Sequence, residues 1–181
     1  LAAKEEELNK NEEAVKAGWK QYNDGKAQLA SLQQTLAGLQ EYERQIREIN
    51  DLINAGGQTP EELDRLQASL AQVTMASELT KQAVMAQDSI RTAMNQAGVA
   101  DENSPYFTAV FEQVVQTVTA QQTPVLEESR QTLLSYEAQI KDGRAQIADA
   151  KAQLEEAGKV LNEKEIDFAE APAKLADGER Q

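Results

Sequence analysis

The sequence predicts an all-α fold: a long antiparallel coiled-coil helical hairpin with a small helical head at its distal tip. Apolar residues recur at seven-residue steps toward the end of the chain, which is typical of a long helix with a narrow apolar seam. The beginning of the chain has a matching seam. Aromatic residues make up only 4% of the 181 residues, and Ala, Gln, Glu, Leu and Lys dominate, as in long helices. The C-terminal seam consists of Leu126, Leu133, Ile140, Ile147, Leu154, Leu161, Phe168 and Leu175.

The N-terminal seam has two apolar lines on one helix face. Each terminal stretch is about 50 residues long, or roughly 75–80 Å at ~1.5 Å per residue, so the two lengths match as the arms of a hairpin must. We therefore expect residues 1–54 and 124–181 to form the arms and residues 55–123 to form the head. The two N-terminal lines are Leu1, Leu8, Val15, Tyr22, Leu29 and Leu36, and Leu32, Leu39, Ile46 and Ile53.

Turn signals divide the chain into helices. Three Ser/Thr-Pro pairs each fit an N-cap followed by proline at the first helical position, and glycines 56, 57 and 98 are stop signals. We expect the second helix to break near residues 74–77, because it is too long to close against the short third one. The pairs are Thr59-Pro60, Ser104-Pro105 and Thr123-Pro124, and the expected helices are 2–54, 60–97, 105–121 and 124–170 or beyond.

The third expected helix is the most apolar segment, and it predicts the core of the head. Met75, Met85 and Met94 are expected to fill gaps in this core. A second interpretation leaves Tyr106 or Val115 exposed as a docking patch for a partner. The apolar residues of this helix are Phe107, Val110, Phe111, Val114, Val115 and Val118.

The two seams also predict how the arms are aligned. In an antiparallel pair the numbers of facing residues have a constant sum, and a sum of 179 places Ile53 opposite Leu126. Large residues then face small ones along the outer stretch. Glycine inside a helix costs about 0.8–1 kcal/mol relative to Ala, and close backbone approach explains its use here. The expected interface pairs Gly18 with Leu161, Gly25 with Leu154, Tyr22 with Ala157, Leu29 with Ala150 and Leu36 with Gly143.

Trp19 lies next to the seam, between Lys16 and Lys20. Its ring is expected either to shield Gly18 or to touch a second copy of the chain, so oligomer formation is compatible with the pattern. Trp19, Tyr106 and Val115 are therefore the candidate partner contacts.

Composition argues against several classes of function. The chain has no Cys and no His, which disfavours zinc, haem and thiol sites and histidine base catalysis. A formal charge of −13 disfavours nucleic acid as a partner, because phosphate binding needs clustered Lys and Arg. Paired carboxylates such as Glu61-Glu62 and Glu127-Glu128 suit first helical turns better than a catalytic cleft. We expect no catalytic residue, no metal and no cofactor.

One short sequence motif recurs along the arms. The motif occurs first as Asp24-Gly25-Lys26-Ala27-Gln28-Leu29 and again as Asp142-Gly143-Arg144-Ala145-Gln146-Ile147. A truncated copy is Asp177-Gly178-Glu179-Arg180-Gln181. This repeated motif resembles sequences in the extracellular coiled-coil insertions of FtsX-like (MacB-type) ABC transporter permeases of Gram-positive bacteria. It covers roughly residues 1–45 and 130–181 and nothing in the head. Membrane proteins of the YhgE/phage-infection type carry similar helices.

The resemblance implies a role that the residue pattern alone does not indicate. It implies a longer parent protein with membrane-spanning helices on both sides of this segment, which would stand on the extracellular side of the cell membrane. It also implies a cytoplasmic ATPase as partner. The head would meet a protein or cell-wall partner, or the arm would transmit motion. The alternatives are an extracellular domain of the YhgE type and a soluble structural adaptor.

Overall fold

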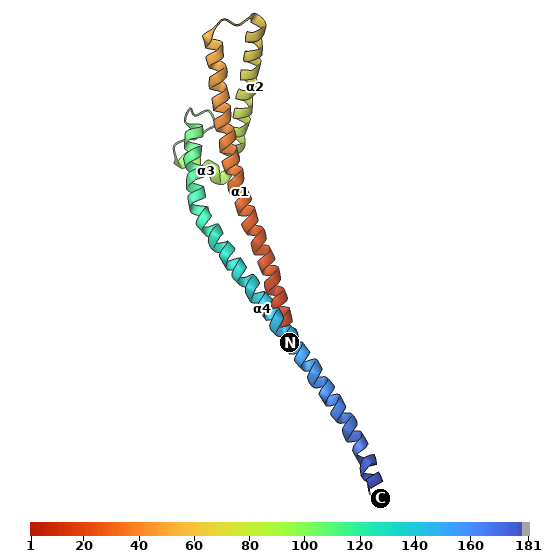
Figure 1. Cartoon of the computed structure of the whole chain (residues 1–181). Helices are drawn as coiled ribbons and strands as arrows, with labels where there is room; N and C mark the ends of the chain where they lie inside the picture. Colours follow the sequence, from red (N-terminus) through yellow and green to blue (C-terminus); the bar gives the residue numbers. More distant parts are fainter. Residues whose placement is uncertain (179–181) are drawn as a thin grey trace. The chain divides into compact units, whose positions relative to one another are not determined.

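The computed structural model describes the backbone of residues 1–178 and the side chains of residues 1–166 and 168–170 (Figure 1). This part of the chain forms four α-helices joined by short loops, without a strand, which confirms the predicted all-α class. The helices are α1 (Ala2–Ala55), α2 (Pro60–Met85), α3 (Asp88–Gln96) and α4 (Phe107–Gly178).

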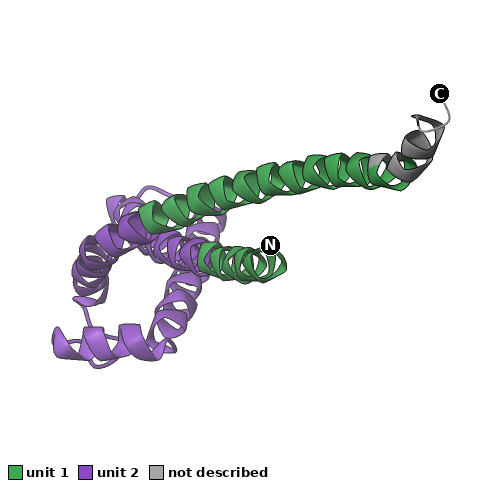
Figure 2. Cartoon of the chain, turned by 90° about the horizontal axis from the view of Figure 1, so that it is seen from below, with its two compact units in different colours: residues 1–20, 130–181 green, residues 21–129 purple. Residues whose placement is uncertain are grey.

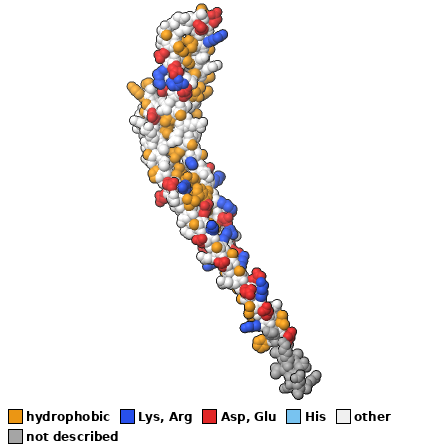
Figure 3. Space-filling model, in the orientation of Figure 1, with side chains coloured by type: hydrophobic (Ala, Val, Ile, Leu, Met, Phe, Trp, Pro, Cys, Tyr) orange, Lys and Arg blue, Asp and Glu red, His pale blue; other side chains and the backbone are white. Residues whose placement is uncertain are grey.

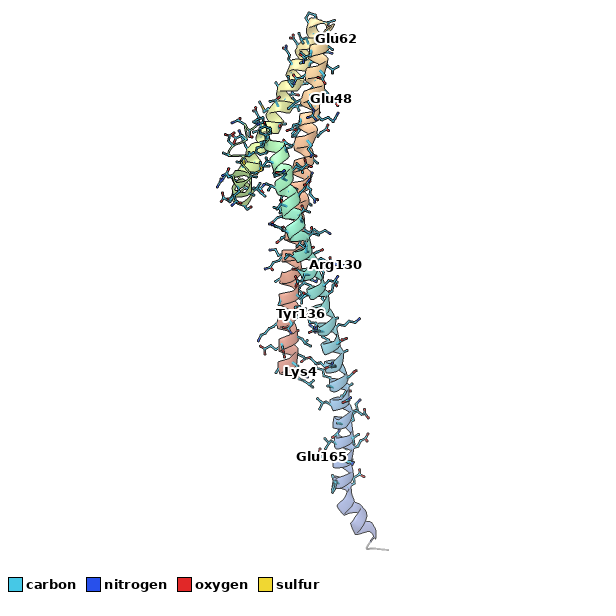
Figure 4. All side chains as sticks on the ribbon, turned by 90° about the vertical axis from the view of Figure 1, so that its left-hand side faces the viewer. Lys4, Glu48, Glu62, Arg130, Tyr136 and Glu165 are labelled. Atoms are coloured by element: carbon cyan, nitrogen blue, oxygen red, sulfur yellow. The ribbon has the colours of Figure 1, made fainter. Side chains whose placement is uncertain are left out.

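The turn between α1 and α2 follows from its residues. Gly56 and Gly57 adopt φ values of 72° and 85°, which side chains other than glycine rarely tolerate. Thr59 then caps α2: its hydroxyl accepts from the Glu62 amide at 3.3 Å, and the Glu62 carboxylate accepts from the Thr59 amide at 2.8 Å. In Figures 1 and 4, α2 runs back in the opposite direction to the end of α1. The predicted cap and the predicted first helix are confirmed.

The second predicted helix breaks later than expected. α2 continues through residues 74–77 and ends at Met85, and α3 begins at Asp88. Because Val84 and Met85 are buried just before the break and Ile90 just after it, the turn lets the chain cover one core from two directions. Residues 74–77 contain no glycine or proline to interrupt the helix.

A second difference concerns Thr123-Pro124, which was expected to start the last arm. α4 instead begins at Phe107 and passes through both residues without interruption. Pro124 removes one backbone donor, a cost that continuous packing can outweigh. The helix keeps its spacing across the proline, and Val118 before it and Leu126 after it are both partly buried.

The described chain divides into two compact units (Figure 2). Unit 1 comprises residues 1–20 and 130–181, and unit 2 comprises residues 21–129. The predicted division into arms (1–54 and 124–181) and a head (55–123) describes the helices by their role and stays a prediction. The distal part of α1 belongs to unit 2 because the head packs directly on it.

Unit 2 contains the main hydrophobic core. Leu39 of α1, Val84 of α2, Met94 of α3, and Phe107 and Phe111 of α4 are completely buried there. The prediction that the Phe107–Val118 segment and two of the three methionines form a core is confirmed. Met75 is 63% exposed, so its predicted core position is wrong.

Candidate helix-pairing interface

In unit 1 the first turns of α1 pack closely against the middle of α4. A Cβ atom added at Gly18 would lie 2.5 Å from Leu133 Cδ2, and one added at Gly143 would lie 2.9 Å from Leu8 Cδ2. Each glycine therefore accommodates a leucine of the other helix. Val15 and Ile140 are buried along the same contact. The predicted use of glycine for close helix approach is confirmed.

The partners of these glycines differ from the predicted ones. Gly18 contacts Leu133 in unit 1, and in unit 2 a Cβ atom at Gly25 would lie 3.1 Å from Leu126 Cδ2. In both units the facing residue numbers add up to 151, not 179. Leu154 and Leu161, the expected partners of Gly25 and Gly18, are 60% and 68% exposed. The predicted register is wrong by 28 residues, which is four heptads.

The remaining predicted interface residues are partly or fully covered. Leu29 is buried, and Tyr22 and Ala150 are half-buried. Leu36 packs against the core of unit 2. Gly143, expected opposite Leu36, contacts Leu8 instead. These side chains lie on the predicted faces of α1 and α4, but the four-heptad shift gives Gly143 a different partner.

One flank of the unit 1 interface carries polar contacts at heptad spacing. Trp19 Nε1 donates to Glu137 at 2.6 Å, Arg144 pairs with Glu12, and Lys151 pairs with Glu5. The α4 members are seven residues apart, and so are the α1 members. We call this series the polar ladder. Sequence reasoning based on the apolar seam missed it, although the heptad spacing of these charges was visible.

The polar ladder shifts the acidity of its members. The hydrogen bond from Arg144, assisted by the charge of Arg144, lowers the pKa of Glu12 below its ordinary value. The hydrogen bond from Lys151 likewise lowers the pKa of Glu5. Both glutamates are therefore held in the ionised form that the pairing requires.

The opposite flank of the same helix pair is an open groove. It has a volume of ≈ 520 Å³, and Tyr136 on its wall is 51% exposed. The polar residues that line this groove are neutral, so they provide no ion pair that would fix the alignment of the helices. The groove is lined by Leu8, Asn11, Ala14, Val15, Leu133, Tyr136, Gln139 and Ile140.

The three candidate partner contacts have different environments. Tyr106 is 70% exposed at the start of α4. Val115 is only 3% exposed in the core of unit 2, so its predicted role in a docking patch is wrong. Trp19 is half-buried, and its indole belongs to the polar ladder.

The described residues contain no cluster of metal-ligating side chains and no membrane-spanning helix. Among them no group of three or more acidic, His or Cys side chains is arranged to hold a metal ion. No described helix is long and apolar enough to cross a membrane. Comparison with protein-family models, with curated proteins and with solved structures finds no match.

Proposed function

We propose that this chain is a non-catalytic coiled-coil arm of an ABC-type membrane transporter permease, located on the extracellular side of the cell membrane. In this role it contacts a protein or cell-wall partner through the head, or transmits movement that a cytoplasmic ATPase generates. The repeated Asp-Gly-x-x-Gln motif supports the family assignment by resemblance.

The observation that carries the mechanical part is the polar ladder together with the glycine contacts. Three polar contacts at successive heptads oppose sliding of α1 past α4, and the leucines seated on Gly18 and Gly143 oppose it sterically. A shift of α1 along α4 by one residue would break the three polar contacts and the two glycine–leucine contacts at once. Helices held in this way move as one body, as a lever that passes on a displacement must.

The location is tested in intact cells. The chain has no cysteine, so Tyr106→Cys introduces a single thiol into it at an exposed position. The complete parent protein carrying this change should react with a membrane-impermeant maleimide in intact cells. The buried control Phe107→Cys should react only after denaturation. Labelling of Tyr106→Cys only after lysis would contradict the extracellular assignment.

The transporter assignment needs a separate experiment. The parent protein, purified in mild detergent, should bring down an ATPase, and ATP hydrolysis should appear in the purified complex. A parent that spans the membrane but copurifies with no ATPase favours the YhgE type. A parent without spanning helices favours the soluble adaptor.

A further inference from the structure

We infer that the face of α4 carrying Leu154, Leu161 and Phe168 is the docking site of a further helix, antiparallel to α4, with small residues facing these side chains and basic residues on its flank. In Figure 4, α4 continues past the level of Lys4 toward Glu165, where α1 no longer accompanies it. Residues 151–166 and 168–170 are all exposed. This pairing goes beyond the proposed function and does not depend on where the parent protein is located.

The first support is continuity with an existing interface. Leu133, Ile140 and Ile147 are buried where α4 passes α1. Leu154 and Leu161 continue the same line at the same seven-residue spacing, with Phe168 one step further, but they are 60%, 68% and 80% exposed. The line of large apolar residues on the face that holds α1 therefore continues past the first residue of α1, so an antiparallel helix in line with α1 is the occupant that fits it.

The second support is the size pattern of the face. At the positions three residues after the large ones, α4 carries the small residues Gly143, Ala150 and Ala157, and then Lys164 after Leu161. Gly143 receives Leu8 of α1, and Ala150 lines a groove with Leu1. Ala157 is thus a site for a large aliphatic residue of the occupant, and Leu154 and Leu161 require small residues opposite them, as Leu133 requires Gly18.

The third support is charge. Between residues 152 and 170 the sequence has six acidic side chains and two lysines, and Lys159 is already paired with Glu155 at 3.0 Å. Figure 3 shows red side chains among orange ones along this part of the helix. Two copies of this stretch would bring like charges together, whereas a helix with Lys or Arg on its flank is attracted. The acidic side chains are Glu155, Glu156, Glu163, Glu165, Asp167 and Glu170.

The test uses the full chain and a synthetic peptide of about four heptads with Leu at the first position, Ala at the fourth and Lys at the fifth. Binding is measured by fluorescence anisotropy. Leu154→Glu and Leu161→Glu should each weaken binding by about tenfold or more, because a charge then replaces a buried anchor. The matched control Leu79→Glu, at a site 59% exposed on α2, should bind as the unchanged chain does.

Orientation is read from Trp19, the only tryptophan of the chain. A dansyl group on the C-terminal end of the peptide should accept energy from Trp19 more strongly than one on the N-terminal end, because an antiparallel helix brings its C-terminus toward Leu1. The reverse order would overturn the inference. Equal binding of a peptide with Glu in place of Lys would also overturn it. A dimer of the chain alone that Leu161→Glu abolishes would assign the face to a second copy instead.

Discussion

Glycine has opposite effects at different positions of these helices. Gly18 lies under Leu133, whereas a Cβ atom added at Gly38 would have no neighbour within 4 Å. Both are inside α1, where glycine costs helix stability through its backbone entropy. The contact with α4 offsets this cost only at Gly18.

We therefore expect the two alanine substitutions to diverge. Gly38→Ala should raise the free energy of unfolding by about 0.8–1 kcal/mol, the difference in helix propensity. Gly18→Ala should give no such gain, because its Cβ atom would stand 2.5 Å from Leu133 Cδ2 and displace that side chain. Urea denaturation of both variants measures the difference. An equal gain in both would show that Gly18 is not a close-packing position.

Arg144 and Glu12 illustrate how a surface pair responds to pH. Because the pKa of Glu12 is lowered on folding, the pair stabilises the fold above the ordinary glutamate pKa. That contribution is lost as the pH falls through the lower folded value. The stability difference between the unchanged chain and Arg144→Gln should thus be larger at neutral pH than in acid.

The same pair gives a direct measurement. In an NMR titration the Glu12 carboxyl should have a higher pKa in Arg144→Gln than in the unchanged chain, because the donor and the charge are both lost. Lys159→Gln is the matched control, since the ion pairs of Lys159 with Glu155 and Glu156 lie within α4 and away from Glu12. If Lys159→Gln moved the Glu12 pKa as far, the shift would not come from the ladder.

At the scale of elements, α4 shows how packing overrides a local breaker. Thr123-Pro124 has the form of a helix start, yet the helix is continuous from Phe107 to Gly178. Proline inside a helix costs about 3 kcal/mol. α4 buries Phe111 before the proline and Ile140 after it, and this packing works against the cost of the proline.

Replacing the internal proline should consequently stabilise the chain. Pro124→Ala should raise the free energy of unfolding by up to about 3 kcal/mol, because it restores a backbone donor and removes a steric clash. Pro60→Ala, at the first position of α2, should instead lower stability by about 0.4–1 kcal/mol through the freer unfolded chain. Thermal and urea unfolding compare the two. A lower free energy of unfolding in Pro124→Ala would mean that Pro124 stabilises the fold rather than destabilising α4.

At the scale of the whole chain, stability depends on where apolar residues are buried rather than on how many there are. Phe111→Ala should lower the free energy of unfolding by about 3–5 kcal/mol, because Phe111 is completely buried. Phe168→Ala should change it by less than about 0.5 kcal/mol, because Phe168 is 80% exposed. Comparable losses in both would contradict the described packing.

The register was the main error of sequence reasoning, and its cause is geometric. A slip of four heptads leaves every seam residue on the seam, so an apolar pattern of period seven does not distinguish a sum of 179 from 151. The flanking charges do distinguish them. In the observed register, flank pairs such as Glu12 and Arg144 have numbers that add up to 156; the predicted register raises this sum by 28 to 184 and would place Glu12 beside Pro172.

The core segment of the head was predicted, but the break in its second helix was placed too early. The apolar spacing of Phe107–Val118 identified the core segment, and the Gly56-Gly57 turn identified the end of α1. The break after Met85 escaped detection because no glycine or proline marks it. That turn depends on the core it closes, since Val84 and Ile90 are buried on either side of it.

The sequence by itself determined the helical class, the faces of α1 and α4 that pack, and the glycines that receive leucines, because these follow from local spacing and side-chain size. Only the tertiary structure decided which heptads meet. The core of unit 2 places Leu39 with Phe107 and Phe111, and the Gln40 amide donates to Glu112 at 3.4 Å. Once these residues are together, the regular rise of the two helices brings Gly25 to Leu126 within the same unit.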